Sequence, residues 1–246
     1  MKKILLLTLL IISISSSNCK SNNNMDTNKK LPLEYIIRQP QVRLKKSPVI
    51  FMLHGYGSNE QDLFSFAEEL PDQYTVISLR APYNLPGFGY AWYMIDFDAD
   101  KEYWGNMKQA VESRDLIVDF IDKACEMYNL DSRNITLLGF SQGSILSMAI
   151  AISYPRKVKN VIALSGYLDK NILKEGYEKE NFSALRFYVS HGASDQVVPI
   201  EWARQTPPML KKLGIKHVYE EFPVGHGVCP ENFYSFRDWL KRNAIL

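Results

Sequence analysis

The sequence predicts an α/β fold, with a mainly parallel central sheet and helices on both of its faces. Short apolar runs alternate along the chain with stretches in which apolar residues recur at helical spacing. A run that is apolar throughout, such as Pro48–Leu53, is expected for a strand covered on both faces. Strands that alternate with helices favour parallel pairing. The 246 residues, 46% of them hydrophobic, suffice for one large domain with a full core.

Each predicted strand ends where turn-forming or polar residues interrupt the apolar run. Pro48–Leu53 leads into His54–Gly57, and a later run leads into Gly139–Gly143. Ligands of parallel sheets bind beyond the carboxyl ends of the strands, so both segments are candidate parts of a site. The predicted strands are 48–53, 75–79, 135–138, 158–164, 185–189 and 217–222.

The predicted helices follow several of these strands. Ser58 with Gln61 suits a capping box for a helix that carries Leu63 and continues to Leu70. Apolar residues at positions i, i+3, i+4 and i+7 indicate another helix from Ile117 to Ala124. Further helices are expected at 145–152, at 201–213 with a distortion at its two prolines, and at 231–243.

Residues 1–18 have the pattern of a secretory signal peptide and are not expected to join the fold. Two lysines precede the apolar stretch 4–14, which is too short to span a bilayer as a helix. The small residues that follow and end at Cys19 resemble the lipobox of bacterial lipoproteins, in which the cysteine is lipidated. Asn18 departs from that pattern. The alternative is ordinary signal cleavage nearby, with Cys19 a bystander.

The remaining chain divides into a tether, residues 19–30, and one folded domain, residues 31–246. The tether is rich in Ser, Asn and Lys and is expected to be flexible. We expect an exported protein. If Cys19 is lipidated, the protein is anchored to a membrane, on its periplasmic side or at the cell surface. Otherwise it is periplasmic. The net charge is only +2, and the lysines before residue 31 supply it, so no basic nucleic-acid footprint is expected.

The sequence contains no metal-ligand spacing, phosphate loop or cofactor motif, so neither a metal nor a cofactor is expected. Two of its three cysteines, Cys125 and Cys229, lie in the domain. Cys125 falls on the apolar face of a helix and is expected to pack as a small hydrophobe. The sequence leaves open whether the two pair.

Ser141 is the candidate nucleophile. It lies in Gly139-Phe-Ser-Gln-Gly143, a G-x-S-x-G segment between a predicted strand and a predicted helix. A sharp strand-to-helix turn exposes the serine hydroxyl above the sheet and strains its backbone. Side chains two residues to either side would clash, which explains the glycines.

A catalytic serine needs a base, and the chain has four histidines. His217 falls within a strand, while His54 and His191 each precede a glycine at a strand end and can shape their turns. His226 lies between two glycines in the loop after the last strand, from which an imidazole can reach Ser141. His226 is therefore the expected base, with His54 as the next candidate.

The imidazole in turn needs a carboxylate to orient it and to stabilise its charged form. Asp195 lies just past the fifth predicted strand and is the favoured acid. Asp169, after the fourth strand, is the rival, because some hydrolases place the acid one strand earlier. The order Ser141, Asp195, His226 is that of the α/β-hydrolase triad.

Acyl transfer builds negative charge on the former carbonyl oxygen, so an oxyanion hole is also expected. One donor should be the backbone N–H of Gln142, which follows the nucleophile. The other should be the N–H of Tyr56, in the loop after the first buried strand.

Several segments together resemble the phospholipase/carboxylesterase family, which includes bacterial carboxylesterases and acyl-protein thioesterases. The resemblance extends from about Ser47 to the C-terminus and implies the α/β-hydrolase fold. It also implies that Ser141, Asp195 and His226 form a catalytic triad. Members of the family are small hydrolases that lack a lid and act on carboxylic esters or thioesters. The segments that carry it are Leu53–Asp62, Arg80–Pro82, Gly89–Tyr93, Gly139–Gly143, His191–Pro199 and Gly225–Gly227.

Access to the site should be open, because residues 165–184 leave too little chain for a large lid. The Gly/Pro/aromatic loop at about 82–106 carries Trp92 and Tyr93, which are expected to form a wall of the substrate pocket. We also expect Val198 to contact substrate. The alternative is that the loop aromatics only pack onto the core.

The leading hypothesis is a serine hydrolase that cleaves short-to-medium acyl or aryl esters, or thioesters, through an acyl-enzyme on Ser141. The expected partner is a small-molecule ester or an acylated substrate. An exported acetyl or feruloyl carbohydrate esterase, or a peptidase of the same fold, is the alternative, because fold and triad do not name a substrate. An inactive binding protein with this fold is a remote third hypothesis.

Overall fold

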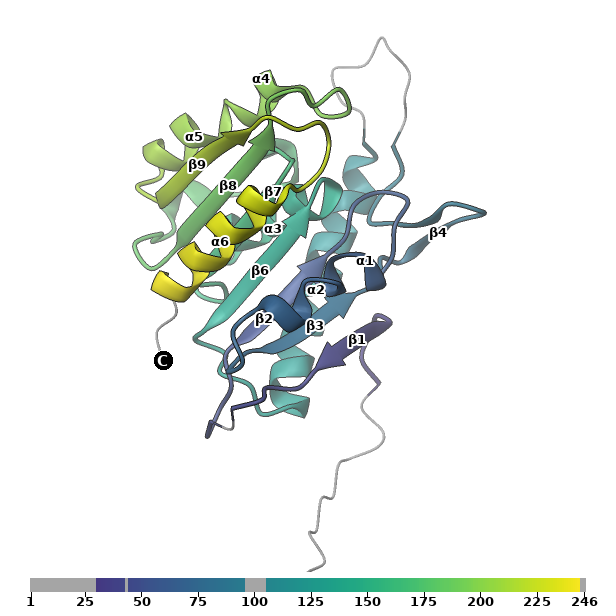
Figure 1. Cartoon of the computed structure of the whole chain (residues 1–246), viewed down its shortest axis with the longest axis vertical. Helices are drawn as coiled ribbons and strands as arrows, with labels where there is room; N and C mark the ends of the chain where they lie inside the picture. The colour runs from purple at the N-terminus through teal and green to yellow at the C-terminus, as the bar shows by residue number, and fades with distance from the viewer. Residues whose placement is uncertain (1–29, 43, 96–104, 244–246) are drawn as a thin grey trace, which may run out of the picture. The chain divides into compact units, whose positions relative to one another are not determined.

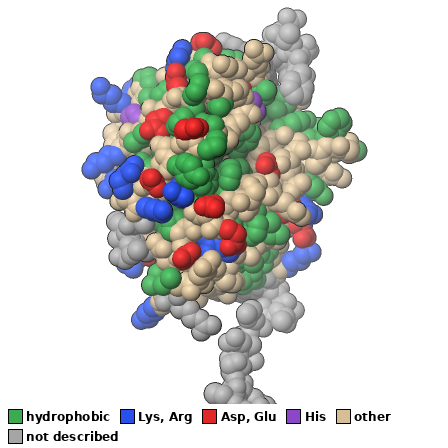
Figure 2. Space-filling model, in the orientation of Figure 1, with side chains coloured by type: hydrophobic (Ala, Val, Ile, Leu, Met, Phe, Trp, Pro, Cys, Tyr) green, Lys and Arg blue, Asp and Glu red, His purple; other side chains and the backbone are tan. Residues whose placement is uncertain are grey.

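The structure of the protein is a computed structural model that describes residues 30–42, 44–95 and 105–243. The chain from Leu31 onward groups into one compact unit. Figure 2 shows acidic and basic side chains interspersed on one face of it. The expected signal peptide, Cys19 and all of the expected tether but Lys30 lie outside the described residues. In the described ranges, no helix is both long and apolar enough to cross a membrane.

A central sheet of seven strands organises the domain. Its strands are β1 (Tyr35–Arg38), β2 (Val49–Leu53), β3 (Thr75–Leu79), β6 (Ile135–Phe140), β7 (Asn160–Leu164), β8 (Arg186–Gly192) and β9 (Lys216–Phe222). They follow the order β1-β3-β2-β6-β7-β8-β9 (Figure 1), and every neighbouring pair is parallel except β1 with β3. The predicted mainly parallel sheet is confirmed.

Strand β1 is the one strand of this sheet that the sequence does not predict. It is only four residues long and pairs antiparallel with β3 at the edge of the sheet, with Tyr35 opposite Leu79 and Arg38 opposite Val76. Three of its residues are only half-buried. A short edge strand of this kind lacks the continuous apolar run that marks a strand covered on both faces.

Helices cover both faces of the sheet, as predicted. They are α1 (Gln61–Phe64), α2 (Met107–Met127), α3 (Gln142–Ser153), α4 (Ile200–Ala203), α5 (Thr206–Lys212) and α6 (Pro230–Asn243). Successive strand residues point to opposite faces. Val49, Phe51 and Leu53 of β2 pack with α2 and α3. Ile50 and Met52 pack on the other face with α1 and α6, and Figure 1 shows α6 in front of the sheet.

Helix α3 is buried along its whole length, because it contacts strands of the sheet and is also in contact with α2. Two of its serines bond to backbone carbonyls of the preceding turn: Ser144 donates to the Ser141 carbonyl (2.9 Å) and Ser147 to the Gly143 carbonyl (2.8 Å). The N-terminal end of α3 is therefore fixed relative to β6.

Two helices are shorter in the structure than the stretches of sequence that predict them. The capping box at Ser58 is wrong: its hydroxyl donates to the Asp62 carboxylate (2.8 Å), and α1 ends at Phe64 before a separate turn, η1 (Ala67–Glu69). The helix predicted over 201–213 is divided into α4 and α5. Its two prolines lie in the first turn of α5, where a missing N–H costs nothing.

The long loop predicted at about 82–106 contains a hairpin, β4 (Tyr83–Leu85) with β5 (Gly89–Ala91). Gly87 and Gly89 have positive φ angles, which the tight connection requires. Phe88 at the tip is 77% exposed. Residues 96–104 of this loop lie outside the described ranges.

Burial along α6 gives a direct test of its packing on the sheet. Phe236 is fully buried, whereas Tyr234 on the same helix is 51% exposed. We expect Phe236→Ala to lower the free energy of unfolding by about 3–5 kcal/mol, because it removes a large core side chain and leaves a cavity. We expect Tyr234→Ala to cost less than about 1 kcal/mol. Urea denaturation of both variants measures the difference, and equal costs would contradict this packing.

Candidate active site

Ser141 lies at the sharp turn between β6 and α3. Its φ of 51° and ψ of −117° are strained for a residue with a side chain. A Cβ on Gly139 would lie 2.3 Å from the Gly143 carbonyl oxygen, and a Cβ on Gly143 would lie 2.0 Å from the Leu53 carbonyl oxygen. The expected need for glycine at both positions therefore has a steric cause in the structure.

The structure brings the three predicted triad residues together at the carboxyl ends of three strands. His226 Nε2 lies 3.0 Å from Ser141 Oγ, and His226 Nδ1 lies 2.7 Å from Asp195 Oδ2. The Phe140 ring packs against the imidazole, with ring centroids 4.9 Å apart. This geometry lets Nε2 accept the serine proton while the Nδ1–H donates to the carboxylate.

Asp195 is held by the loop that follows β8. Its Oδ1 accepts the backbone N–H groups of Val197 and Val198, both at 2.9 Å. Its side chain is fully buried. A carboxylate fixed by two backbone donors keeps Oδ2 directed at His226.

The loops that carry Asp195 and His226 are locked to each other. A Cβ on Gly192 would lie 2.0 Å from the Gly225 carbonyl oxygen, so only glycine permits this approach. The Ser194 N–H donates to the Val224 carbonyl at 3.0 Å. Neither contact follows from the sequence, because the two loops follow different strands.

His191 supports the acid and was expected only to shape its turn. His191 is fully buried. Its Nε2 lies 2.9 Å from the Val198 carbonyl oxygen and 3.3 Å from Asp195 Oδ2. Asp195 Oδ2 thus faces two imidazoles, one on each side. The spacing of four residues between His191 and Asp195 was the available sequence signal for this contact.

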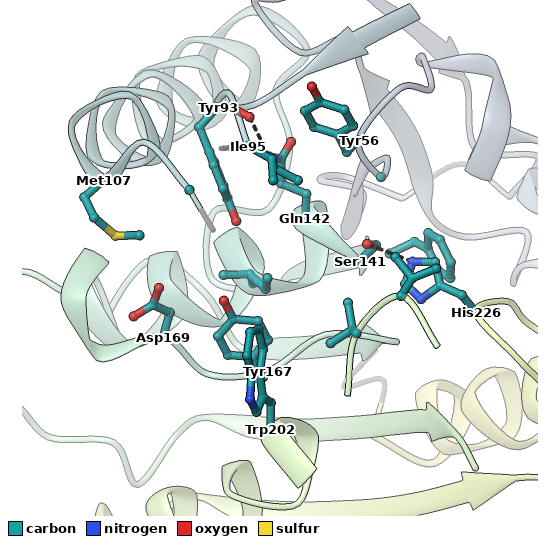
Figure 3. Close-up of a pocket in the computed structure, with 16 residues that line it drawn as sticks. Tyr56, Tyr93, Ile95, Met107, Ser141, Gln142, Tyr167, Asp169, Trp202 and His226 are labelled. Atoms are coloured by element: carbon teal, nitrogen blue, oxygen red, sulfur yellow. Dashed lines mark hydrogen bonds between the residues drawn. The ribbon is translucent and has the colours of Figure 1, made fainter. Parts of the chain in front are cut away.

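The rival candidates occupy other places. His54 donates from Nδ1 to the Gly55 carbonyl (2.7 Å) and accepts the Ala81 N–H at Nε2 (3.1 Å), so both ring nitrogens are engaged. Burial lowers the pKa of His54 and favours its neutral form. The Asp169 carboxylate accepts from Asn171 and lies apart from His226 in the pocket (Figure 3). Neither completes the triad.

The two expected oxyanion donors lie beside Ser141. Tyr56 and Gln142 both line the same cavity as the nucleophile (Figure 3). Gln142 is the first residue of α3, and the first N–H groups of a helix have no partner within the helix. Both positions suit donation to an oxygen bound next to Ser141.

The Gln142 side chain has a second task that the sequence did not indicate. Its Oε1 accepts the Trp92 N–H (2.8 Å), and its Nε2 donates to the Tyr93 carbonyl (2.7 Å). The residue after the nucleophile thereby clamps the segment that follows β5. This clamp fixes one wall of the cavity relative to Ser141.

The expected substrate contact at Trp92 is wrong. Trp92 is fully buried and does not line the cavity. Its indole N–H donates to the His54 carbonyl (2.9 Å), and its own carbonyl accepts the Ser113 hydroxyl. Trp92 stabilises the Tyr56 loop from the core side, because its indole N–H is bonded to the carbonyl of His54 at the start of that loop. Tyr93 and Val198 do line the cavity.

An ion pair anchors the far end of the Tyr56 loop. Arg80 donates from Nε to Glu60 Oε2 (2.6 Å) and from Nη2 to Glu60 Oε1 (2.5 Å), a bidentate arrangement. These hydrogen bonds hold the pKa of Glu60 below its usual range. The Gly57 N–H donates to the Tyr90 carbonyl (2.9 Å), which ties the same loop to the hairpin.

The cavity next to Ser141 has a volume of about 210 Å³ and mainly apolar walls. Tyr56, Tyr93, Tyr167, Trp202 and Met107 contribute to them. Between β7 and β8 the chain forms only two single-turn helices, η2 (Lys170–Ile172) and η3 (Tyr177–Lys179), and no large lid.

Within the described part of the chain, no group of three or more His, Cys, Asp or Glu side chains could hold a metal ion. Cys125 and Cys229 are both free thiols, so the open question of a bridge is answered. Burial raises the pKa of Cys125 to about 11, which keeps it protonated.

The fold and the site define a serine hydrolase of the α/β-hydrolase type: a strained serine after a central strand, a histidine in hydrogen-bond reach and a buried aspartate behind it. The family model described as Phospholipase/Carboxylesterase matches residues 36–244. The chain belongs to this family, and it is an ester hydrolase.

Relatives agree with this membership. Acyl-protein thioesterase 1 of Mycosarcoma maydis is 25% identical over 234 residues, which cover 85% of this chain and 97% of that protein. Acyl-protein thioesterase 1 of Emericella nidulans is 29% identical over 223 residues, covering 80% and 91%. The crystal structure of the Bacillus cereus carboxylesterase is 17% identical, covers 87% of this chain and 95% of that chain, and superposes with a TM-score of 0.75. This last likeness concerns the fold.

The close approach at Gly143 predicts a severe effect of a single methyl group. We expect Gly143→Ala to reduce kcat/KM for p-nitrophenyl acetate by at least about 100-fold, because the displaced α3 moves Ser141 and Gln142. Gly227→Ala is the matched control: it lies next to His226, and a Cβ there meets nothing within 4 Å. Activity assays and thermal melts of both variants test this, and a fully active Gly143→Ala enzyme would contradict it.

Proposed function

We propose that the protein is a serine esterase that hydrolyses carboxylic esters with short-to-medium acyl or aryl groups through an acyl-enzyme on Ser141. The observation that carries the proposal is the continuous hydrogen-bonded chain from Ser141 through His226 to Asp195, with distances of 3.0 and 2.7 Å. This chain opens onto an apolar cavity that can receive the substrate.

In the first half-reaction, His226 Nε2 takes the proton of the Ser141 hydroxyl as its oxygen attacks the ester carbonyl carbon. Asp195 stabilises the imidazolium that forms. The former carbonyl oxygen becomes negative, and the N–H groups of Gln142 and Tyr56 stabilise it. His226 then protonates the leaving alcohol or thiol, and in the second half-reaction water releases the acid by the same steps.

The size of the cavity favours small substrates. Its volume of about 210 Å³ is below the range of about 300–1,000 Å³ that is common for ligand pockets. The short described segment between β7 and β8 forms no large lid over the site, which favours soluble esters over emulsified lipid. Thioesters are included in the proposal because the two fungal relatives are named as acyl-protein thioesterases.

We also propose that the enzyme is exported and attached to a membrane through a lipid on Cys19. The support is the sequence pattern: two lysines, an apolar stretch, small residues and then a cysteine. The polar segment 20–30 would hold the catalytic domain away from the lipid surface. Lipid attachment needs a second interaction for stable anchoring when only one acyl chain is present.

Removal of the nucleophile tests the mechanism. Ser141→Ala is expected to lower the rate of p-nitrophenyl butyrate hydrolysis by about 10⁶-fold, to the background of the assay, since the covalent step is lost. The matched control, Ser183→Ala, changes an exposed serine in the turn before β8 and should keep wild-type activity. Circular dichroism establishes that both variants fold, and a folded Ser141→Ala enzyme that retains turnover would refute the acyl-enzyme.

Membrane attachment has a separate test. Cys19→Ala is expected to move the protein from the membrane fraction to the soluble fraction of cells, because it removes the acceptor of the lipid. Cys229→Ala changes a free thiol of the domain and should leave the distribution as in the wild type. Fractionation followed by immunoblotting measures both, and an unchanged membrane fraction for Cys19→Ala would rule out this anchor.

A further inference from the structure

The cavity has a polar end that the hydrolytic mechanism does not use. Asp169 lies just after β7, is only 7% exposed and lines the cavity together with Tyr93 and Tyr167. Figure 3 shows His226 on one side of Ser141, and Tyr93, Tyr167 and Asp169 on the other. A carboxylate is a costly group to place in a small apolar cavity unless it has partners.

The position of His226 indicates that this end of the cavity receives the acyl group of the substrate. His226 must protonate the leaving group, so the leaving alcohol or thiol lies next to the imidazole. The acyl group then extends away from His226 along the cavity. Asp169 therefore faces the far end of the acyl group and not the leaving group.

Only one oxygen of Asp169 is engaged by the described residues. Asp169 Oδ1 accepts the backbone N–H of Asn171 (2.9 Å) and its side-chain Nδ2 (2.8 Å), which fixes the carboxylate in place. Within the described ranges, Oδ2 has no hydrogen-bond partner. A fixed carboxylate with one unused oxygen is a ready acceptor for a donor on the substrate.

The two tyrosines lie in the electric field of this carboxylate. Burial raises the pKa of Tyr167, and the charge of Asp169 raises it further. Burial also raises the pKa of Tyr93, with additional contributions from Tyr167 and Asp169. Both hydroxyls stay protonated. Because the described lining contains neither Lys nor Arg, this end of the cavity disfavours anionic acyl groups and favours hydrogen-bond donors.

The walls around the polar end suit a flat ring. The Trp202 and Tyr167 rings meet edge to face, with centroids 5.1 Å apart and an interplanar angle of 71°. Both rings line the cavity, as does that of Tyr93. Aromatic rings arranged in this way pack well against another ring.

We propose that Asp169, together with Tyr93 and Tyr167, forms a hydrogen-bond-accepting subsite for the acyl group, so that the enzyme prefers esters of hydroxylated aromatic acids. The proposal rests on the serine esterase function proposed above and narrows its substrate class. The phenol O–H of the acyl group donates to Asp169 Oδ2 while its ring lies between the aromatic walls. Asp169 is thereby a specificity residue.

The experiment compares esters that differ only in the phenol. We would measure kcat/KM for the methyl esters of 4-hydroxycinnamate, cinnamate and 4-methoxycinnamate, and for 4-hydroxybenzoate and benzoate as a shorter pair. A hydrogen bond to a charged acceptor predicts a preference of about 10- to 100-fold for the hydroxylated member of at least one pair. The methoxy ester, which has no proton to donate, should behave like the unsubstituted ester.

Variants locate the origin of the preference. Asp169→Asn should reduce the hydroxyl preference about fivefold to tenfold, because a neutral acceptor replaces a charged one. The preference is a ratio within one variant, so a general change in activity cancels. Glu201→Gln is the matched control: it removes an acid from α4, next to Trp202, that does not line the cavity, and it should keep the wild-type ratio.

The outcomes are distinct. Equal kcat/KM for hydroxylated and unsubstituted esters in the wild type, in both pairs, would overturn the proposal whether or not any variant folds. An undiminished preference in Asp169→Asn, or a stronger preference for an ester with a 4-aminomethyl group, would also overturn it. If Asp169→Asn does not fold, Tyr167→Phe provides the second variant and should lower the same ratio. Hydrolysis of p-nitrophenyl butyrate that depends on Ser141 would show in each case that the esterase function itself stands.

Discussion

The packing of α3 against the sheet is the constraint on which the rest of the site depends. The helix approaches β2 so closely that a Cβ at Gly143 would lie 2.0 Å from the Leu53 carbonyl oxygen. This approach requires the strained backbone of Ser141, and a helix buried on all sides supplies the packing that holds the strain. The placement of the Ser141 hydroxyl at the cavity and that of the Gln142 N–H are consequences of one turn.

Hydrogen bonds connect this turn to the Tyr56 loop and to the segment that carries Trp92 and Tyr93. The Gln142 side chain holds the Trp92–Tyr93 segment, Trp92 holds the His54 carbonyl, and the His54 ring holds the Ala81 N–H. The nucleophile, the Tyr56 loop and the cavity wall therefore share one network of buried polar groups. Such a network is rigid because each donor and acceptor would be costly to leave without a partner.

The acid and the base form a second rigid unit. Gly192 lets the loop after β8 touch the loop after β9, and the backbone N–H groups of Val197 and Val198 hold Asp195. His191 contacts the same carboxylate from inside the sheet. Preorganisation of this kind lets the site meet the developing charge without rearrangement. The specificity for the acyl group then depends on the opposite wall of the cavity, where Asp169 lies.

The sequence by itself determined the class of fold, because continuous apolar strands and amphipathic helices have distinct periods. It also determined the reacting residues, since the turn at Ser141 needs its glycines locally. Tertiary structure alone decided the rest. The edge strand β1 is too short and too little buried to show the continuous apolar run of a covered strand, and Trp92 turns inward because its partners come from distant segments. The helix predicted to reach Leu70 ends at Phe64, and the chain continues as the separate turn η1. The sequence makes Asp169 a rival for the triad, yet only the folded chain places it in the acyl cavity, because that depends on which loops meet beyond the ends of the strands.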